Sequence, residues 1–172
     1  MAKSDAFFIR AKVTQPTATA DYQQASIDLG SYVNLGVAKS TLLRIHNIAV
    51  QIVDSDNNMS GPYKTGSVLN VGYQLTTQTQ TELVDLTDKS VVASGRYSVM
   101  VGAADEFFEA DVKDMLPQSW TKGYLIGTDT LFLGIDADQT PSAGAYDVCI
   151  VLECTLESAS QSNSVALALS QS

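Results

Sequence analysis

Histidine is nearly absent from this chain, which has one histidine among 172 residues. A single imidazole excludes metal sites built on two or three histidines, and it leaves His46 and perturbed carboxylates as the only groups for acid–base chemistry near neutral pH. No Gly-x-Ser-x-Gly segment supplies a nucleophile. We therefore expect a hydrogen-bonded structural role for His46, no enzymatic activity, and no catalytic residue or cofactor.

Cysteine is also scarce, because Cys149 and Cys154 are the only two in the chain. They lie five positions apart in one expected strand, which places them on opposite faces and, at about 3.3 Å per residue, on the order of 16 Å from each other. This separation excludes a disulfide or a shared metal ion. We expect Cys154 to act as a small core residue.

Basic residues are few and scattered along the sequence. The chain has 10 basic residues against 19 acidic ones, a formal net charge of -9, and no two basic residues in succession. A phosphate backbone repels such a chain, so we expect no direct binding of nucleic acid. The acidity is typical of a solvated surface, and adaptation to a saline medium is the alternative.

Long apolar runs are missing as well. No stretch of 18 uninterrupted apolar residues occurs, and Arg10 interrupts the short apolar patch near the N-terminus. The sequence therefore predicts neither a signal peptide nor a membrane span, and any membrane contact would be peripheral.

Alternation of apolar and polar residues is what the chain has in abundance. The run YDVCIVLECTL at residues 146–156 places Val148, Ile150 and Leu152 on one face and Cys149, Val151 and Glu153 on the other, which is typical of a half-buried strand. Similar runs predict strands at residues 6–13, 25–33, 41–53, 67–77, 90–101, 123–127, 130–135 and 145–158, with a polar edge strand at 78–86. Both faces of residues 41–53 are apolar, which indicates two-sided burial or a register shift near His46 and Asn47.

Two segments depart from this pattern. Residues 105–116 are expected to form a helix, because Phe108, Val112 and Met115 recur at helical spacing, Asp105 can cap the start and Pro117 can end it. Residues 159–172 are rich in Ser, Gln and Ala. We expect one domain over residues 1–158, with 159–172 as a free tail or as an intersubunit arm that adds a strand to a neighbour.

Acidic turns are the only candidates for an ion site. Asp54, Asp56 and Asn58 match the first three ligand positions of a calcium loop, but Met59 and Thr65 stand where the loop needs Gly and Glu. A second acidic pair, Asp136 and Asp138, precedes another turn. We expect turn chemistry at both places and no metal site. Weak calcium or sodium binding at one of them is the alternative.

About eight antiparallel strands with one short inserted helix suit an all-β sandwich, either an immunoglobulin-like one or a jelly roll. The strand count, the long connections and the inserted helix favour the jelly roll. Neither architecture closes its edges fully, so both favour oligomers.

The segment AFFIRAKV at residues 6–13, the Thr-, Gln- and Ser-rich surface, the inserted helix and the strand-forming tail resemble the small single jelly-roll major capsid proteins of tailless icosahedral double-stranded DNA viruses of bacteria and archaea. The resemblance covers the whole chain as one of size and pattern. It implies a structural virion protein, a capsid subunit that self-assembles into an icosahedral shell. Its partners would be copies of itself and other capsid proteins, with peripheral contact to an internal viral membrane. Residues 2–12 would form a base-facing arm.

The alternative is a carbohydrate- or receptor-binding β-sandwich module. Trp120 and Tyr124, beside Lys122, are the aromatic side chains that could stack on a sugar, together with the acidic turns. A tryptophan in the core or in a subunit contact is the competing interpretation of Trp120.

Overall fold

A computed structural model describes residues 5–17, 19–35, 39–58, 62–101, 107–110, 119–142 and 144–171. These residues form nine strands and one helix: β1 (Phe7–Gln15), β2 (Gln23–Asp28), β3 (Lys39–Asp54), β4 (Val68–Thr76), β5 (Val91–Val101), β6 (Phe107–Ala110), β7 (Ser119–Ile126), β8 (Thr130–Ala137), β9 (Tyr146–Ser160) and α1 (Gln161–Ser170). No helix in the described ranges is both long enough and apolar enough to cross a bilayer.

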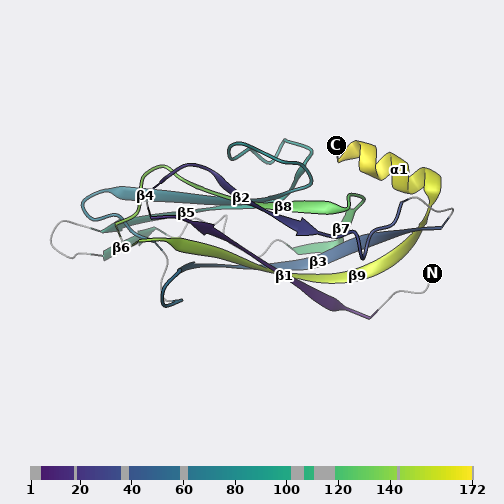
Figure 1. Ribbon diagram of the computed structural model, residues 1–172, viewed down its shortest axis with the longest axis horizontal. Coiled ribbons are helices and arrows are strands. Elements are labelled where there is room, and N and C mark those ends of the chain that lie inside the picture. The colour runs from purple at the N-terminus through teal and green to yellow at the C-terminus, as the bar shows by residue number, and fades with distance from the viewer. Residues whose placement is uncertain are drawn as a thin grey trace.

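The strands form two stacked sheets in the order of a jelly roll (Figure 1). Sheet A has the order β1-β9-β3-β7 and sheet B the order β2-β8-β4-β5-β6, and every neighbouring pair is antiparallel. The last strand therefore lies between the first and the third, and the eighth lies between the second and the fourth. This nesting is that of a jelly roll, with β6 added at one edge. In a constant-type immunoglobulin sandwich, by contrast, the first strand lies in one sheet and the last strand in the other.

The core lies between the sheets and is made by the inward side chains of alternating strands. In β9, Val148, Ile150, Leu152 and Cys154 are all buried, whereas Cys149 is partly exposed. The expected core position of Cys154 is confirmed, and both cysteines are free thiols.

A register shift in β3 explains why both of its faces are apolar. Its pairing with β9 and with β7 slips between Ile45 and Asn47. Because of this bulge, Ile45 faces Cys154 and Ile48 faces Leu152, so both isoleucines enter the core although they are three positions apart. The shift predicted near His46 and Asn47 is confirmed.

The helix predicted at residues 105–116 is wrong over the part that the structure describes. Phe107–Ala110 is strand β6, which pairs with β5 from Ser98 to Val101. The long β5 offers an open row of backbone groups, and a short apolar run cannot be assigned to helix or strand by periodicity alone. The remainder of 105–116 lies outside the described residues.

The chain end is also different from the prediction. Strand β9 continues to Ser160, and residues 161–170 form α1 instead of a free tail or an added strand. Gln171 is 4% exposed and donates its backbone N–H to Leu167. Alanine and leucine are strong helix formers, which outweighs the weak alternation of Val165, Leu167 and Leu169. A role of this segment between subunits stays a prediction.

Residues 2–12 do not form a separate arm throughout. Strand β1 begins at Phe7 and pairs with β9 along its whole length, from Phe7 opposite Cys154 to Gln15 opposite Tyr146. A base-facing arm would therefore have to come from the residues that precede Phe7.

Tyr73 and Tyr146 lie in the core. Within the described part of the chain, neither hydroxyl group has a hydrogen-bond partner. Burial raises the pKa of Tyr73 to about 12. Tyr73→Phe is expected to leave stability at pH 7 unchanged or to raise it by about 1 kcal/mol, because it removes an unsatisfied buried hydroxyl.

The advantage of Tyr73→Phe should grow above pH 10. The unfolded chain ionises near pH 10 while the folded chain resists ionisation, so the unmodified protein loses stability as the pH rises from 10 towards 12. Urea unfolding at pH 7 and at pH 11 measures both effects. A loss of more than 1 kcal/mol at pH 7 would show that the hydroxyl has a partner.

Candidate interaction surfaces

A loop covers the outer face of sheet B. This loop, residues 77–90, is called the β4–β5 loop and is the stretch predicted as an edge strand, which is wrong because 78–86 contains no strand. The buried side chain of Gln74 holds it: Nε2 donates to the carbonyl of Glu82 (2.9 Å), and Oε1 accepts from the amide of Val84 (2.8 Å). The loop therefore bonds to a side chain instead of a neighbouring strand.

Two glycines let the covering side chains lie directly on the sheet. A Cβ atom on Gly72 would overlap Leu83 Cδ1, and one on Gly134 would overlap the hydroxyl oxygen of Tyr22. Tyr22 also accepts a hydrogen bond from Gln74 Nε2 (2.9 Å). The loop is therefore packed on sheet B and is not a free excursion.

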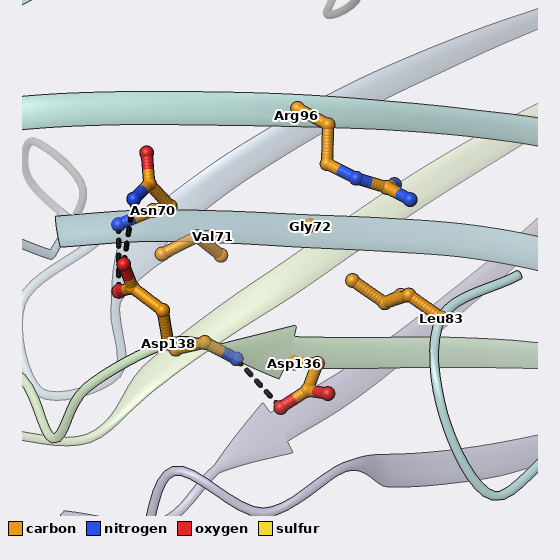
Figure 2. A pocket seen from close by; sticks show the side chains of 8 residues that line it. Asn70, Val71, Gly72, Leu83, Arg96, Asp136 and Asp138 are labelled. Atoms are coloured by element: carbon orange, nitrogen blue, oxygen red, sulfur yellow. Dashed lines mark hydrogen bonds between the residues drawn. The ribbon is translucent and has the colours of Figure 1, made fainter. Parts of the chain in front are cut away.

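A hollow of about 250 Å³ opens beside Leu83, between Arg96 and the acidic pair Asp136 and Asp138 (Figure 2). Asp138 is paired with Asn70, whose backbone N–H and Nδ2 donate to its two carboxylate oxygens at 2.9 and 2.6 Å. Asp136 Oδ1 accepts from the Ala137 amide (2.8 Å). The acidic pair thus belongs to the sheet surface, at the end of β8.

Burial raises the pKa of the Asp136 carboxyl, and nearby Asp21 and Glu82 raise it further, while the Ala137 amide and Arg96 act in the opposite direction. A carboxyl with a raised folded pKa lowers stability as the pH rises from the unfolded pKa to the folded one, because the unfolded chain gives up its proton first. Asp136→Asn should therefore be more stable than the unmodified chain at pH 7 and should lose this advantage near pH 4.

Urea midpoints at the two pH values test this expectation, with Asp56→Asn as the control because Asp56 is exposed. An equal effect of the two substitutions at both pH values would contradict the role of burial at Asp136.

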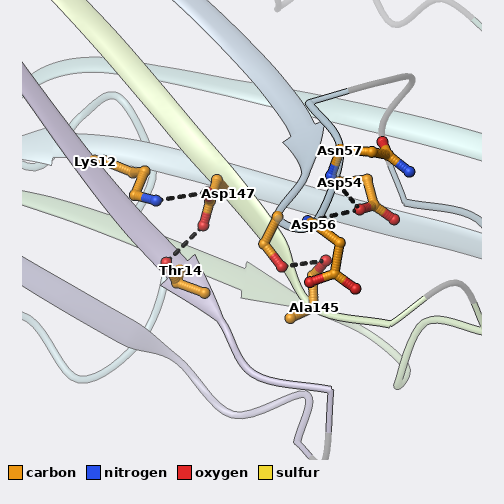
Figure 3. A network of polar contacts seen from close by, with 8 residues as sticks. Lys12, Thr14, Asp54, Asp56, Asn57, Ala145 and Asp147 are labelled. Carbon is orange, nitrogen blue, oxygen red and sulfur yellow. Dashed lines mark hydrogen bonds and ion pairs between the residues drawn. The ribbon is translucent and has the colours of Figure 1, made fainter.

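The turn after β3 is an ordinary hydrogen-bonded turn (Figure 3). Asp54 Oδ1 accepts from the amides of Asp56 (2.8 Å) and Asn57 (3.3 Å), and Asn58 has a φ of 58°. This confirms the predicted turn chemistry. In the described ranges no group of three or more His, Cys, Asp or Glu residues could hold a metal ion. Weak calcium binding by Asp54, Asp56 and Asn58 stays a prediction.

Basic residues line the outer face of sheet A along β1. Lys12 Nζ lies 2.8 Å from Asp147 Oδ2, and Thr14 Oγ1 donates to Asp147 Oδ1 (Figure 3). The Lys12 side chain is 58% exposed and that of Asp147 only 2%. Arg10 and Lys12 flank a shallow apolar hollow of about 340 Å³ over Cys149 and Val151.

His46 lies on the same outer face, where its Nε2 is 2.8 Å from Thr155 Oγ1. The expected hydrogen-bonded role is confirmed. Beside it, Arg44 donates from Nε and Nη2 to the two carboxylate oxygens of Glu157, each at 2.7 Å. In such a bidentate ion pair, the guanidinium and the carboxylate neutralise each other. This arrangement is a structural brace between β3 and β9.

Trp120 and Tyr124 do not form an exposed aromatic platform. Their ring centroids are 5.4 Å apart, and both rings are partly buried against the core. Ser119, the residue before Trp120, pairs with Asn47 of β3. Asp54 lies seven residues further along β3, so the acidic turn is about 23 Å from this pair. The structure does not bring the predicted sugar-binding residues together.

Exposed apolar side chains are the feature that the sequence pattern missed. Leu86 at the tip of the β4–β5 loop is 69% exposed, Leu169 on α1 67% and Phe8 on β1 55%. Val68 and Met100 are direct cross-strand partners and are exposed together. Hydrophobicity in the sequence alone does not distinguish these residues from core residues.

No protein-family model and no curated protein matches the chain. Among solved structures it is similar to VP1 of human polyomavirus 12 in complex with 3'-sialyllactosamine, with a TM-score of 0.47, 8% identity, and coverage of 91% of this chain and 100% of that chain. Apo New Jersey polyomavirus VP1 has a TM-score of 0.47 at 6% identity, with coverage of 91% and 100%. The Merkel cell polyomavirus virus-like particle has a TM-score of 0.43 at 9% identity, with coverage of 92% and 75%. Likenesses at this level carry no argument about function, and the jelly-roll assignment rests on the strand order of this chain.

Proposed function

We propose that the chain is a structural virion protein, a capsid subunit that self-assembles into an icosahedral shell. The observation that carries the proposal is the jelly-roll strand order of sheets A and B. Jelly rolls serve as viral capsid subunits, lectin domains and cupins, so the fold alone leaves several functions open. Features of the surface support the capsid subunit among them.

The polar side chains of the described residues support a non-catalytic role. His46 is bonded to Thr155, and Glu157 is paired with Arg44. Asp147 is held by Lys12 and Thr14. Each of these groups spans two strands of sheet A and stabilises it, which is what a structural subunit needs.

The exposed apolar side chains support self-assembly, because several occur as neighbours. Val68 and Met100 pair across β4 and β5, and Val165 and Leu169 stand four residues apart on α1, both exposed. Neighbouring exposed apolar residues mark interaction surfaces more strongly than isolated ones. α1 contains no charged residue, which suits a surface that another subunit covers.

The finer part of the proposal is the kind of virus and the place of each chain end. The chain would belong to tailless double-stranded DNA viruses of bacteria or archaea, with other capsid proteins as further partners and an internal membrane beneath the shell. The residues before Phe7 would face the base of the capsomer. The segment from Ala159 onward, as α1, would lie between subunits.

The test is the size of the purified chain, measured by light scattering over a range of concentrations and by negative-stain microscopy. We expect rings or closed shells of uniform size. A chain that stays monomeric at every concentration and binds glycans on an array would overturn the proposal in favour of a carbohydrate- or receptor-binding module.

One observation favours that second function. The hollow beside Leu83 gathers Arg96, Asp136 and Asp138, polar groups that can hydrogen-bond sugar hydroxyls. If the chain is such a module, Arg96→Ala should abolish glycan binding. Lys122→Ala also removes a basic side chain, but one outside this hollow, and should leave glycan binding unchanged.

A further inference from the structure

We infer that copies of this chain join head to tail, with the tip of the β4–β5 loop of one copy seated in the hollow between Arg10 and Lys12 of the next. The inference rests on the proposed self-assembly and names the surfaces that carry it. The tip is Leu86 with the acidic residues around it, and is called the crest. The hollow over Cys149 and Val151 is called the basic hollow.

The crest is an apolar knob on an acidic loop. Leu86 is more exposed than any other large apolar residue of the described chain, at 69%. Glu82, Asp85 and Asp88 are exposed around it, and Lys89 is the only basic residue of the loop. Arg96 of β5 lines one hollow together with Glu82, Asp85 and Asp88, so these three acidic residues stand against two basic ones, Arg96 and Lys89. The loop therefore presents a leucine within a net negative rim.

The crest is held in one conformation before any partner arrives. The Asp85 carboxylate accepts from the Thr87 amide (2.7 Å) and the Asp88 carboxylate from the Ser90 amide (2.8 Å). The Thr77 amide donates to the Ser90 carbonyl (2.8 Å) and closes the base of the loop. A loop that is already ordered loses little conformational entropy on binding, which favours association.

The basic hollow has the opposite character. Its floor is apolar, from Cys149 and Val151, and its rim is formed by Arg10 and Lys12. Lys12 pairs with Asp147, but Asp147 is buried beneath it, so the charge that faces solvent is that of the ammonium group. An apolar knob with acidic neighbours is therefore complementary to this hollow in both polarity and charge.

The two surfaces lie on opposite sides of the sandwich. The crest stands on the outer face of sheet B, where Gln74 and Gly72 receive the loop, and the basic hollow lies on the outer face of sheet A, on β1 and β9. A contact between different patches is heterologous, and repetition of it closes a ring when the rotation allows and otherwise extends an open array. Two crests repel each other by charge, which disfavours a symmetric dimer through this surface.

Sedimentation velocity of surface variants tests the inference. Leu86→Lys places a cation at the crest, and Arg10→Glu reverses the charge of the hollow. Each variant should weaken association at least about tenfold, with an unchanged urea midpoint because both side chains are exposed. Lys122→Glu, on sheet A away from the hollow, is the matched control and should assemble like the unmodified chain.

Mixing the two variants separates this geometry from any other. The Arg10→Glu chain keeps an intact crest and the Leu86→Lys chain keeps an intact hollow, so a mixture should form heterodimers that grow no further.

The outcomes distinguish the inference from the proposed function. An unmodified chain that remains monomeric overturns self-assembly as a whole. An unmodified chain that assembles while Leu86→Lys and Arg10→Glu assemble equally well overturns the head-to-tail contact alone. Two blocked variants that form no heterodimer on mixing also overturn it. Binding of anionic vesicles by the unmodified chain that Arg10→Glu abolishes, without any effect on assembly, would assign the hollow to a membrane and overturn the contact.

Discussion

Gln171→Ala is expected to lower the free energy of unfolding by about 2–4 kcal/mol, because two buried backbone groups lose their partners. Gln171 Oε1 accepts from the Gly127 amide (2.9 Å), and Nε2 donates to the Leu125 carbonyl (2.7 Å). This side chain thus continues the hydrogen bonding of β7 where the strand ends. Its backbone carbonyl also accepts from Thr77 Oγ1 (2.6 Å), which ties the end of α1 to the β4–β5 loop.

Urea unfolding measures the loss. Ser170→Ala is the control, since that exposed hydroxyl only donates to the Leu167 carbonyl within the helix, and it should cost a few tenths of a kcal/mol. Gln171→Glu keeps the acceptor for Gly127 but sets a buried carboxylate against the Leu125 carbonyl, so it should cost at least as much as Gln171→Ala. Equal stability of Gln171→Ala and Ser170→Ala would contradict the role given to Gln171.

This anchoring changes how the chain end can be tested. Deletion of residues 159–172 removes the Gln171 bonds and the buried pair in which Ser164 Oγ donates to Ser40 Oγ (2.9 Å). Poor assembly of the shortened chain would therefore report weaker folding as well as a lost contact. Substitution of the exposed Leu169 by Ser separates the two, because it changes the surface of α1 and leaves these bonds in place.

Gly123→Ala is expected to cost about 2–5 kcal/mol. Gly123 has a φ of +72°, which an L-residue adopts at a cost of about 1–2 kcal/mol. A Cβ atom there would also stand 2.8 Å from the backbone carbonyl oxygen of Ile45 and 2.8 Å from Arg44 Cγ. Arg44 is held by Glu157 and cannot move freely, so β7 itself would have to shift, at about 1–3 kcal/mol.

Gly66→Ala is the matched control for this prediction. Gly66 has a φ of +73°, almost the same as Gly123, but no atom lies within 4 Å of a Cβ placed there. Its substitution should therefore cost only the conformational part, about 1–2 kcal/mol. Urea unfolding of the two variants isolates the contact with β3, and equal losses would show that the close approach to Ile45 and Arg44 costs nothing.

Much of the fold could be predicted because a strand repeats every two residues. The run at residues 145–158 and the observed β9, Tyr146–Ser160, differ by two residues at most, and its inward side chains were identified from alternation alone. The predicted 41–53 lies within β3, Lys39–Asp54. A bulge was recognisable there because apolar residues changed face near His46.

Three elements escaped prediction because their conformation depends on partners outside the segment itself. Phe107–Ala110 is a strand because β5 offers it a ladder. The β4–β5 loop is not a strand because the side chains of Gln74 and Gln24 bond to its backbone. α1 is a helix held at its end by groups of β7. In each case a short segment had two acceptable local conformations, and tertiary hydrogen bonds selected one.

The sequence by itself determined the class of the fold, the two-faced character of the strands and the acidic balance of the surface, since periodicity and charge are local properties that survive any arrangement of the chain. The tertiary structure alone decided which surfaces exist. Arg10 and Lys12 become the rim of a hollow only because β1 pairs with β9 and so acquires Cys149 and Val151 as a floor. Leu86 becomes an exposed knob only because Gly72 of sheet B lets Leu83 of its loop pack closely, which leaves the tip outside. Contacts between distant strands create both features, and no pattern within one strand encodes them.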